Sequence, residues 1–178
     1  MRHRRIILVF ILCIVLVSGI YLFYNLVIIA KKTVSPNKGY MATYNRLTQT
    51  ITLKSLDEGV VVWRLSGHDP ALLWSPDSKL LAVSNTVSVV GHRAEIYDIE
   101  HSNSMVFSGK TAMQIMLGQT PTTDTDDNRI GTEITKWIDN DNVEVKFFLP
   151  LDSMGQTAAG QYIFEISSCT IKEMSLAE

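Results

Sequence analysis

The sequence has almost no cysteine and little proline. Of its 178 residues, 2 are cysteines and 5 are prolines. Cys13 lies inside a long apolar run, so Cys169 is the only cysteine in the rest of the chain. An intramolecular disulfide beyond the run is therefore impossible, and the domain there must rest on its hydrophobic core. We expect Cys169 to be a half-buried strand residue.

Charged side chains are absent from residues 6–30, IILVFILCIVLVSGIYLFYNLVIIA, between three arginines and two lysines. These 25 residues, at about 1.5 Å rise each, would form a helix of roughly 37 Å, enough to span the hydrocarbon core of a bilayer. We therefore predict that residues 6–30 are a transmembrane signal anchor in contact with the lipid bilayer. Residues 1–5 would be a cytoplasmic stub.

Two alternatives to this topology stay open. A cleaved signal peptide would use Val17-Ser18-Gly19 as its cleavage site, but apolar residues continue beyond it for longer than such peptides need. The positive charges on the two flanks nearly balance, with a small excess before the run, which favours a cytoplasmic N-terminus. The expected product is a single-pass cell-membrane protein with a linker at 31–39 and an extracytoplasmic domain at 40–178.

A basic surplus is also missing. Beyond residue 32 the chain has 11 Lys and Arg against 18 Asp and Glu, a net charge of 11 − 18 = −7. This balance argues against nucleic acid, and against anionic lipid as the main partner, because both require a basic surface.

Helical periodicity is nearly absent after residue 39. Short β-rich segments alternate with turns such as Asp57-Glu58-Gly59, Ser75-Pro76-Asp77-Ser78 and Asp139-Asn140-Asp141-Asn142. The predicted strands cover residues 40–47, 50–56, 60–65, 71–74, 80–84, 94–99, 105–108, 133–138, 143–149, 161–167 and 170–173. Residues 111–132 are the exception, since most of them are polar and loop-like.

Several of these segments resemble the repeats of WD-repeat and TolB-type β-propellers. Residues 60–68 end in Gly-His, and residues 73–84, LWSPDSKLLAVS, resemble the hairpin "W-S-P-D-G-K-x-L-A" of those families. Residues 94–99 stand where the family has a strand ending in Trp-Asp. A weaker copy of the hairpin starts at residue 134, and residues 161–166 match its third strand. The resemblance assigns structural repeat positions to His68, Trp74, Pro76, Asp77, Tyr97, Asp98, Trp137 and Asp139.

A closed propeller needs about four blades or more, whereas the chain supplies one clear blade, one degraded blade and part of a third. We therefore predict an all-β domain of propeller-blade-like antiparallel sheets without closure, behind one N-terminal transmembrane helix. A propeller completed by other chains, or a distinct fold that reuses the hairpin, remains an alternative. Exposed strand edges would then need a cover, such as a protein partner or a second copy.

No catalytic motif is present: the sequence lacks G-x-S-x-G, C-x-x-C, H-E-x-x-H and the P-loop. The resemblance gives His68 and Asp69 a place in a buried structural network. Asp124, Asp126 and Asn128 resemble the start of a calcium loop, but Arg129 replaces the required glycine, which excludes an EF-hand. A looser calcium site there is a minor alternative, so we expect no cofactor and no structural metal.

The leading hypothesis is therefore a non-enzymatic, membrane-anchored protein-interaction module. A ligand-sensing or accessory hydrolytic ectodomain is the alternative, with a site near residues 111–132 and His68 or His92. A third possibility is a remnant of a larger propeller.

Overall fold

The computed structural model describes residues 2–23, 29–88, 91–107, 131–148 and 159–176. Within these ranges, the side chains of residues 2–10, 29–30, 87–88, 91–92 and 176 are outside the description. The described chain has one helix, α1 (Arg2–Phe23), followed by strands only.

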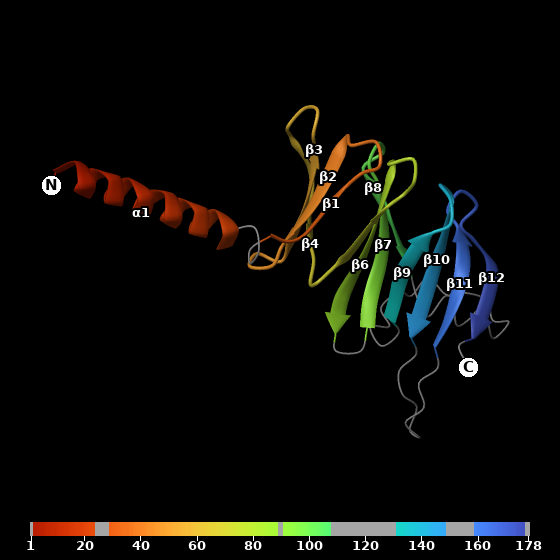
Figure 1. The fold of residues 1–178 in the computed structure, drawn as a ribbon. Helices are drawn as coiled ribbons and strands as arrows, with labels where there is room; N and C mark the ends of the chain where they lie inside the picture. The colour runs from red at the N-terminus through yellow and green to blue at the C-terminus, as the bar shows by residue number, and fades with distance from the viewer. Residues whose placement is uncertain (1, 24–28, 89–90, 108–130, 149–158, 177–178) are drawn as a thin grey trace, which may run out of the picture.

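Twelve described strands form three four-stranded antiparallel sheets, and within each sheet every strand pairs with the strand next to it in sequence. The first sheet contains β1 (Ile29–Val34), β2 (Tyr40–Asn45), β3 (Thr50–Ser55) and β4 (Val61–Ser66). The middle sheet contains β5 (Ala71–Trp74), β6 (Leu80–Ser88), β7 (Gly91–Asp98) and β8 (Asn103–Phe107). The third sheet contains β9 (Gly131–Trp137), β10 (Asn142–Phe148), β11 (Ala159–Glu165) and β12 (Thr170–Leu176). Figure 1 shows them as successive layers, with α1 leaving from the side of the first sheet.

All eleven strands predicted from the sequence are present, with small differences at their ends. The prediction of a linker at 31–39 is wrong, because residues 29–34 form β1 and pair with β2. The predicted anchor at 6–30 is also too long, since α1 ends at Phe23 and Ile29 already belongs to the sheet. The third blade that we expected to be partial is therefore a complete first sheet.

The middle sheet is apolar on both faces. Leu81, Val83 and Tyr97 lie in the core that it shares with the first sheet. Ala82, Ala94 and Ile96 lie in the core that it shares with the third sheet. Because successive strand residues point to opposite faces, the unbroken apolar run of β6 is what a sheet between two others requires.

The first and third sheets have fully buried apolar side chains only on the face that meets the middle sheet. In the first sheet, Ala42, Tyr44, Ile51 and Leu53 are buried, while the residues between them are not. In the third sheet, Val143, Val145 and Phe147 are buried, and Glu144 and Lys146 face the other way. Polar outer faces are typical of the terminal repeats that cap a stack. The stack is open, as predicted, because closing it into a ring would bury these charges.

Helix α1 has 22 residues. The large apolar side chains described between residues 11 and 23 are each 52–69% exposed, so none of them packs into the sheets. Among the residues described with their side chains, no helix combines the length and apolarity needed to cross a membrane.

Candidate functional site

The turn between the first two strands has the same hydrogen bonds in the first and middle sheets. Ser75 Oγ donates to Asp77 Oδ1 at 2.7 Å and accepts from Leu80 N at 2.9 Å. In the first sheet, Ser35 Oγ donates to Asn37 Oδ1 at 2.8 Å and accepts from Tyr40 N at 3.0 Å. Asp77 thus accepts a hydrogen bond within this turn, and Pro76 is exposed at the corner.

The Ser35 turn was not recognised as a repeat from the sequence. Ser35-Pro36 and Ser75-Pro76 are 40 residues apart (75 − 35), close to the length of one propeller blade. That spacing was the available signal. The two turns also meet, because Asn37 N donates to Ser78 Oγ at 3.0 Å.

A second repeated turn joins the third and fourth strands of each sheet. It starts at Ser55, Asp98 or Glu165, and the residue four positions later has a positive φ: 71° at Gly59, 53° at Ser102 and 54° at Cys169. Cys169 is therefore an exposed turn residue, and the expectation of a half-buried strand position is wrong.

Asp98 is the repeat aspartate of the middle sheet. Its Oδ1 accepts from Glu100 N and His101 N at 3.0 and 2.9 Å, and its Oδ2 lies 2.9 Å from His101 Nδ1. Partial burial raises the pKa of Asp98, but the hydrogen bonds from His101 and Glu100 outweigh it and leave that pKa below its ordinary value. The role of Asp98 is to hold the turn.

His68 and Asp69 do not form the buried network that the resemblance implies. Both side chains are exposed. His68 contributes its carbonyl, which accepts from Thr86 N at 3.0 Å. The Asp69 carboxylate pairs with Lys31 Nζ at 2.9 Å, and this contact lowers its pKa. Lys31 belongs to β1, the strand that the sequence analysis missed.

Aromatic repeat residues join the sheets. Trp137 Nε1 donates to Leu73 O at 3.1 Å and so connects the third sheet to the middle one. Trp74 stacks on Tyr40 of the first sheet, with ring centroids 6.3 Å apart. Tyr97 meets Trp63 edge to face at 5.0 Å, and burial, followed by its contact with Glu95, raises its pKa. These residues thus contribute contacts between adjacent sheets of the stack.

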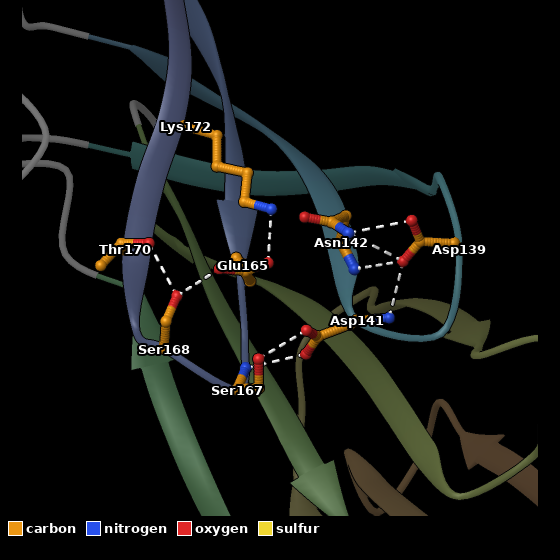
Figure 2. Close-up of polar contacts among 8 residues, drawn as sticks. All are labelled: Asp139, Asp141, Asn142, Glu165, Ser167, Ser168, Thr170 and Lys172. Atoms are coloured by element: carbon orange, nitrogen blue, oxygen red, sulfur yellow. Dashed lines mark hydrogen bonds and ion pairs between the residues drawn. The ribbon is translucent and has the colours of Figure 1, made fainter.

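A cluster of polar side chains lies at one end of the third sheet, where the β9–β10 turn meets the β11–β12 turn (Figure 2). Asp141 Oδ1 accepts from Ser167 N at 2.8 Å and its Oδ2 from Ser167 Oγ at 2.6 Å. Asp139 Oδ1 accepts from Asp141 N and Asn142 N, both at 2.8 Å. The repeat role of Asp139 is thus to close the hairpin.

Glu165 and Lys172 complete this cluster as an ion pair on the neighbouring turn. The bond from Lys172, and then the one from Ser168, lowers the pKa of Glu165, while the pKa of Lys172 is raised by Glu165. Backbone N–H groups similarly lower the pKa of Asp139. Each group is held in its charged form near neutral pH, so it is poorly suited to exchange protons during a reaction.

The outward face of the third sheet contains a shallow depression of about 130 Å³. Its lining comes from three adjacent strands: Glu144, Gln161, Ile163, Glu173, Met174 and Ser175. Tyr162 also borders it, but Tyr162 and Met174 share a cross-strand row with the buried Val145 and pack toward the core. The outward side chains therefore combine two carboxylates, Glu144 and Glu173, with one apolar side chain, Ile163. The Glu144 carboxylate is fixed by Thr135 Oγ1 at 2.6 Å and Lys136 Nζ at 3.0 Å, and these two bonds lower its pKa.

The calcium hypothesis on Asp124, Asp126 and Asn128 falls outside the described residues, as does most of the 111–132 segment. His92 belongs to β7, but its side chain is not described. In the part of the chain that is described, no group of three His, Cys, Asp or Glu side chains is arranged to hold a metal ion.

The fold is similar to that of β-propellers. The propeller domain of the trilobed protease from Pyrococcus furiosus, which has an open velcro topology, is 13% identical with a TM-score of 0.50. The match covers 83% of this chain and 42% of that one. TolB from Acinetobacter baumannii is 16% identical over 80% of this chain and 32% of its own, with a TM-score of 0.43. The RRP9 WD40 repeats are 12% identical, with a TM-score of 0.44, and the match covers 82% of this chain and 38% of that one.

The chain thus spans well under half the length of these propellers. No protein-family model matches the sequence, and no curated protein matches it. The prediction of propeller-blade-like antiparallel sheets is confirmed at the level of fold.

Proposed function

We propose that this chain is a non-enzymatic protein-interaction module that is tethered to a membrane by its N-terminal helix. The observation that supports it most is the free outward face of the third sheet. That face carries the depression between β10, β11 and β12 and lies at the end of the stack farthest from α1 (Figure 1).

The chemistry of the depression favours a side chain of a protein partner as its occupant. Its volume of about 130 Å³ is well below the roughly 300–1,000 Å³ of pockets that enclose small molecules. Ile163 offers contact to an aliphatic stem, and Glu144 and Glu173 offer acceptors to a cation. A lysine or arginine of a partner protein has both parts.

The non-enzymatic part of the proposal rests on the lack of a catalytic motif in the sequence, and three carboxylates of the third sheet are in addition poorly suited to act as general acids. Glu144, Glu165 and Asp139 all have lowered pKa values. A general acid at neutral pH needs the opposite shift.

The tether is supported by the apolar run at 6–30 and by the exposure of apolar side chains on every side of α1. A helix that is apolar all round is stable when lipid or protein surrounds it. The arrangement with a cytoplasmic N-terminus and an extracytoplasmic sheet domain belongs to the same proposal and rests on the flanking charges alone.

Crosslinking and affinity capture of the full chain test the interaction. The Glu173→Lys variant is expected to lose at least tenfold of the captured partner, because it places a cation in the depression. Glu100→Lys, in an exposed turn of the middle sheet, makes the same charge change elsewhere and is expected to capture normally. Equal capture by both variants, or no specific partner for the wild-type chain, would refute the proposal.

Alkaline extraction and thiol labelling test the tether. The full chain is expected to stay in the membrane fraction at alkaline pH. In a Cys13→Ser background, Cys169 is expected to react with a membrane-impermeant maleimide on intact cells, since it is exposed. Release by alkali would exclude the tether, and labelling only after lysis would reverse the orientation.

A further inference from the structure

The outward face of the first sheet is basic. Cross-strand pairing places Lys32, Thr43, Thr52 and Arg64 in one row, and Val34, Met41, Lys54 and Val61 in the next. These rows alternate with the buried ones that contain Tyr44 and Leu53, so they point away from the middle sheet. The two rows contain three cations and no carboxylate.

The surrounding sequence has the same bias. Residues 29–66 contain six basic and two acidic residues, a net charge of 6 − 2 = +4. The described stretches of the third sheet, 131–148 and 159–176, contain three basic and six acidic residues, a net charge of 3 − 6 = −3. The acidic balance of the whole domain therefore hides a basic end and an acidic end.

The basic end is also the end next to α1. Six Cα–Cα steps separate Phe23 from Ile29, which limits their separation to about 21 Å even for an extended chain. Figure 1 shows α1 leaving from the first-sheet side of the stack, whereas the third sheet is the farthest layer from it. A bilayer that holds α1 would thus lie close to the basic face.

We propose that the outward face of the first sheet rests on anionic lipid headgroups. Lys32, Lys54 and Arg64 contact phosphate-bearing headgroups, while Val34 and Val61, which are 42% and 45% exposed, meet the interface. The inference rests on the proposed tether, which brings the face to the membrane surface, and not on its orientation: it requires only that the leaflet on the side of the sheet domain contains anionic lipid. It replaces the expectation that anionic lipid is not the main partner. That expectation used the net charge of the whole domain, whereas the basic and acidic residues lie at opposite ends of the stack.

The attraction is large enough to orient the domain. A basic residue near an anionic membrane surface favours the bound arrangement by about fivefold, so three such residues favour it by about two orders of magnitude. The effect should fall steeply with salt, because the Debye length is only about 3 Å at 1 M.

The test uses the full chain in vesicles of phosphatidylcholine alone or with 30% phosphatidylserine. A Thr43→Cys variant in a Cys13→Ser, Cys169→Ser background carries a fluorophore on the basic face. A quencher attached to lipid headgroups then reports its approach. Quenching is expected to be several-fold greater with phosphatidylserine, to disappear in 1 M salt, and to disappear when Lys54→Glu and Arg64→Glu are added. A fluorophore on native Cys169, in a Cys13→Ser background, is the distant control and should show little quenching in either lipid.

The control for net charge is Lys79→Glu with Lys146→Glu, which changes two exposed lysines elsewhere and should leave Thr43 quenching intact. Flotation with phosphatidylcholine vesicles separates the two proposals, since it depends on α1 and not on lipid charge. If the chain floats with phosphatidylcholine vesicles but its quenching does not depend on lipid charge, the proposed lipid contact of the first sheet is wrong and the tether is unaffected. Binding to phosphatidylserine vesicles alone overturns the tether and supports the face. If the Lys54→Glu, Arg64→Glu variant changes the oligomeric mass and not the quenching, the face is a contact between protein chains and the inference is wrong.

Discussion

Thr132 joins the middle and third sheets where they are packed most tightly. Its side chain is 1% exposed. Its Oγ1 accepts from Ala94 N at 3.2 Å and donates to Phe107 O at 3.1 Å. One hydroxyl from β9 thus satisfies two backbone groups of the middle sheet.

Replacing Thr132 by valine keeps the shape of the side chain and removes both bonds. A buried backbone group left without a partner costs about 1–3 kcal/mol, so the expected loss in the free energy of unfolding is about 2–5 kcal/mol. Thr132→Ser keeps the hydroxyl and loses one methyl group, which costs about 1 kcal/mol. Valine is therefore expected to be clearly the more damaging of the two.

Urea unfolding of the full chain in detergent micelles, followed by tryptophan fluorescence, measures the difference. With a slope of about 1.5 kcal/mol/M, Thr132→Val should lower the midpoint by about 1–3 M and Thr132→Ser by about 0.7 M. Circular dichroism should give the same midpoints if the transition is two-state. If serine proves more damaging than valine, packing and not hydrogen bonding stabilises the contact, and the reasoning is refuted.

Three further predictions concern the described sheets. Gly160→Ala should lower the melting temperature by several degrees, because a Cβ there would clash with the Phe147 ring. Gly19→Ala, whose Cβ meets nothing, should not lower it, and equal melting temperatures of the two variants would contradict the close packing. Cys169→Gly should raise the free energy of unfolding by about 0.5–1 kcal/mol, because glycine adopts the φ of 54° at this position without strain. If Cys169→Gly is no more stable than Cys169→Ala in chemical denaturation, the turn is not strained. The pKa of Asp98 in the folded protein lies below its ordinary value, so its contribution to stability is present above about pH 4 and is lost as pH falls through the folded pKa. Asp98→Asn should melt earlier at pH 6 but lose less stability between pH 5 and 3. A pH profile parallel to that of the wild-type chain would count against that role.

The strands were predictable because two different patterns distinguish the sheets. Residues 50–54, Thr-Ile-Thr-Leu-Lys, alternate between polar and apolar, and β3 has one buried face. Residues 80–83, Leu-Leu-Ala-Val, do not alternate, and β6 is covered on both faces by the cores. Both outcomes follow from the two-residue period of a strand.

The failures have one origin. Strand β1 follows an apolar run and contains Lys31 and Lys32, so its residues read locally as a membrane flank and a linker. Pairing with β2 makes this segment a strand, and the local sequence does not encode that pairing. The error carried over to Asp69, whose partner Lys31 lies on the missed strand. The polar cluster around Asp141 was equally hidden, because its two halves, at Asp141 and Ser167, are 26 positions apart in the sequence.

Within each sheet, every strand pairs with its neighbour in the sequence, and this has a consequence during translation. Each sheet can form as soon as its own four strands have left the ribosome, because none of its strands comes from a distant part of the sequence. The apolar face of the first sheet, however, stays uncovered until the middle sheet follows, from Ser66 to Phe107. At about 5–20 residues per second, those roughly 40 residues take about 2–8 s. A nascent chain paused between β4 and β8 would expose Ala42, Ile51 and Leu53, so that interval is when the growing protein is most open to aggregation and to chaperones.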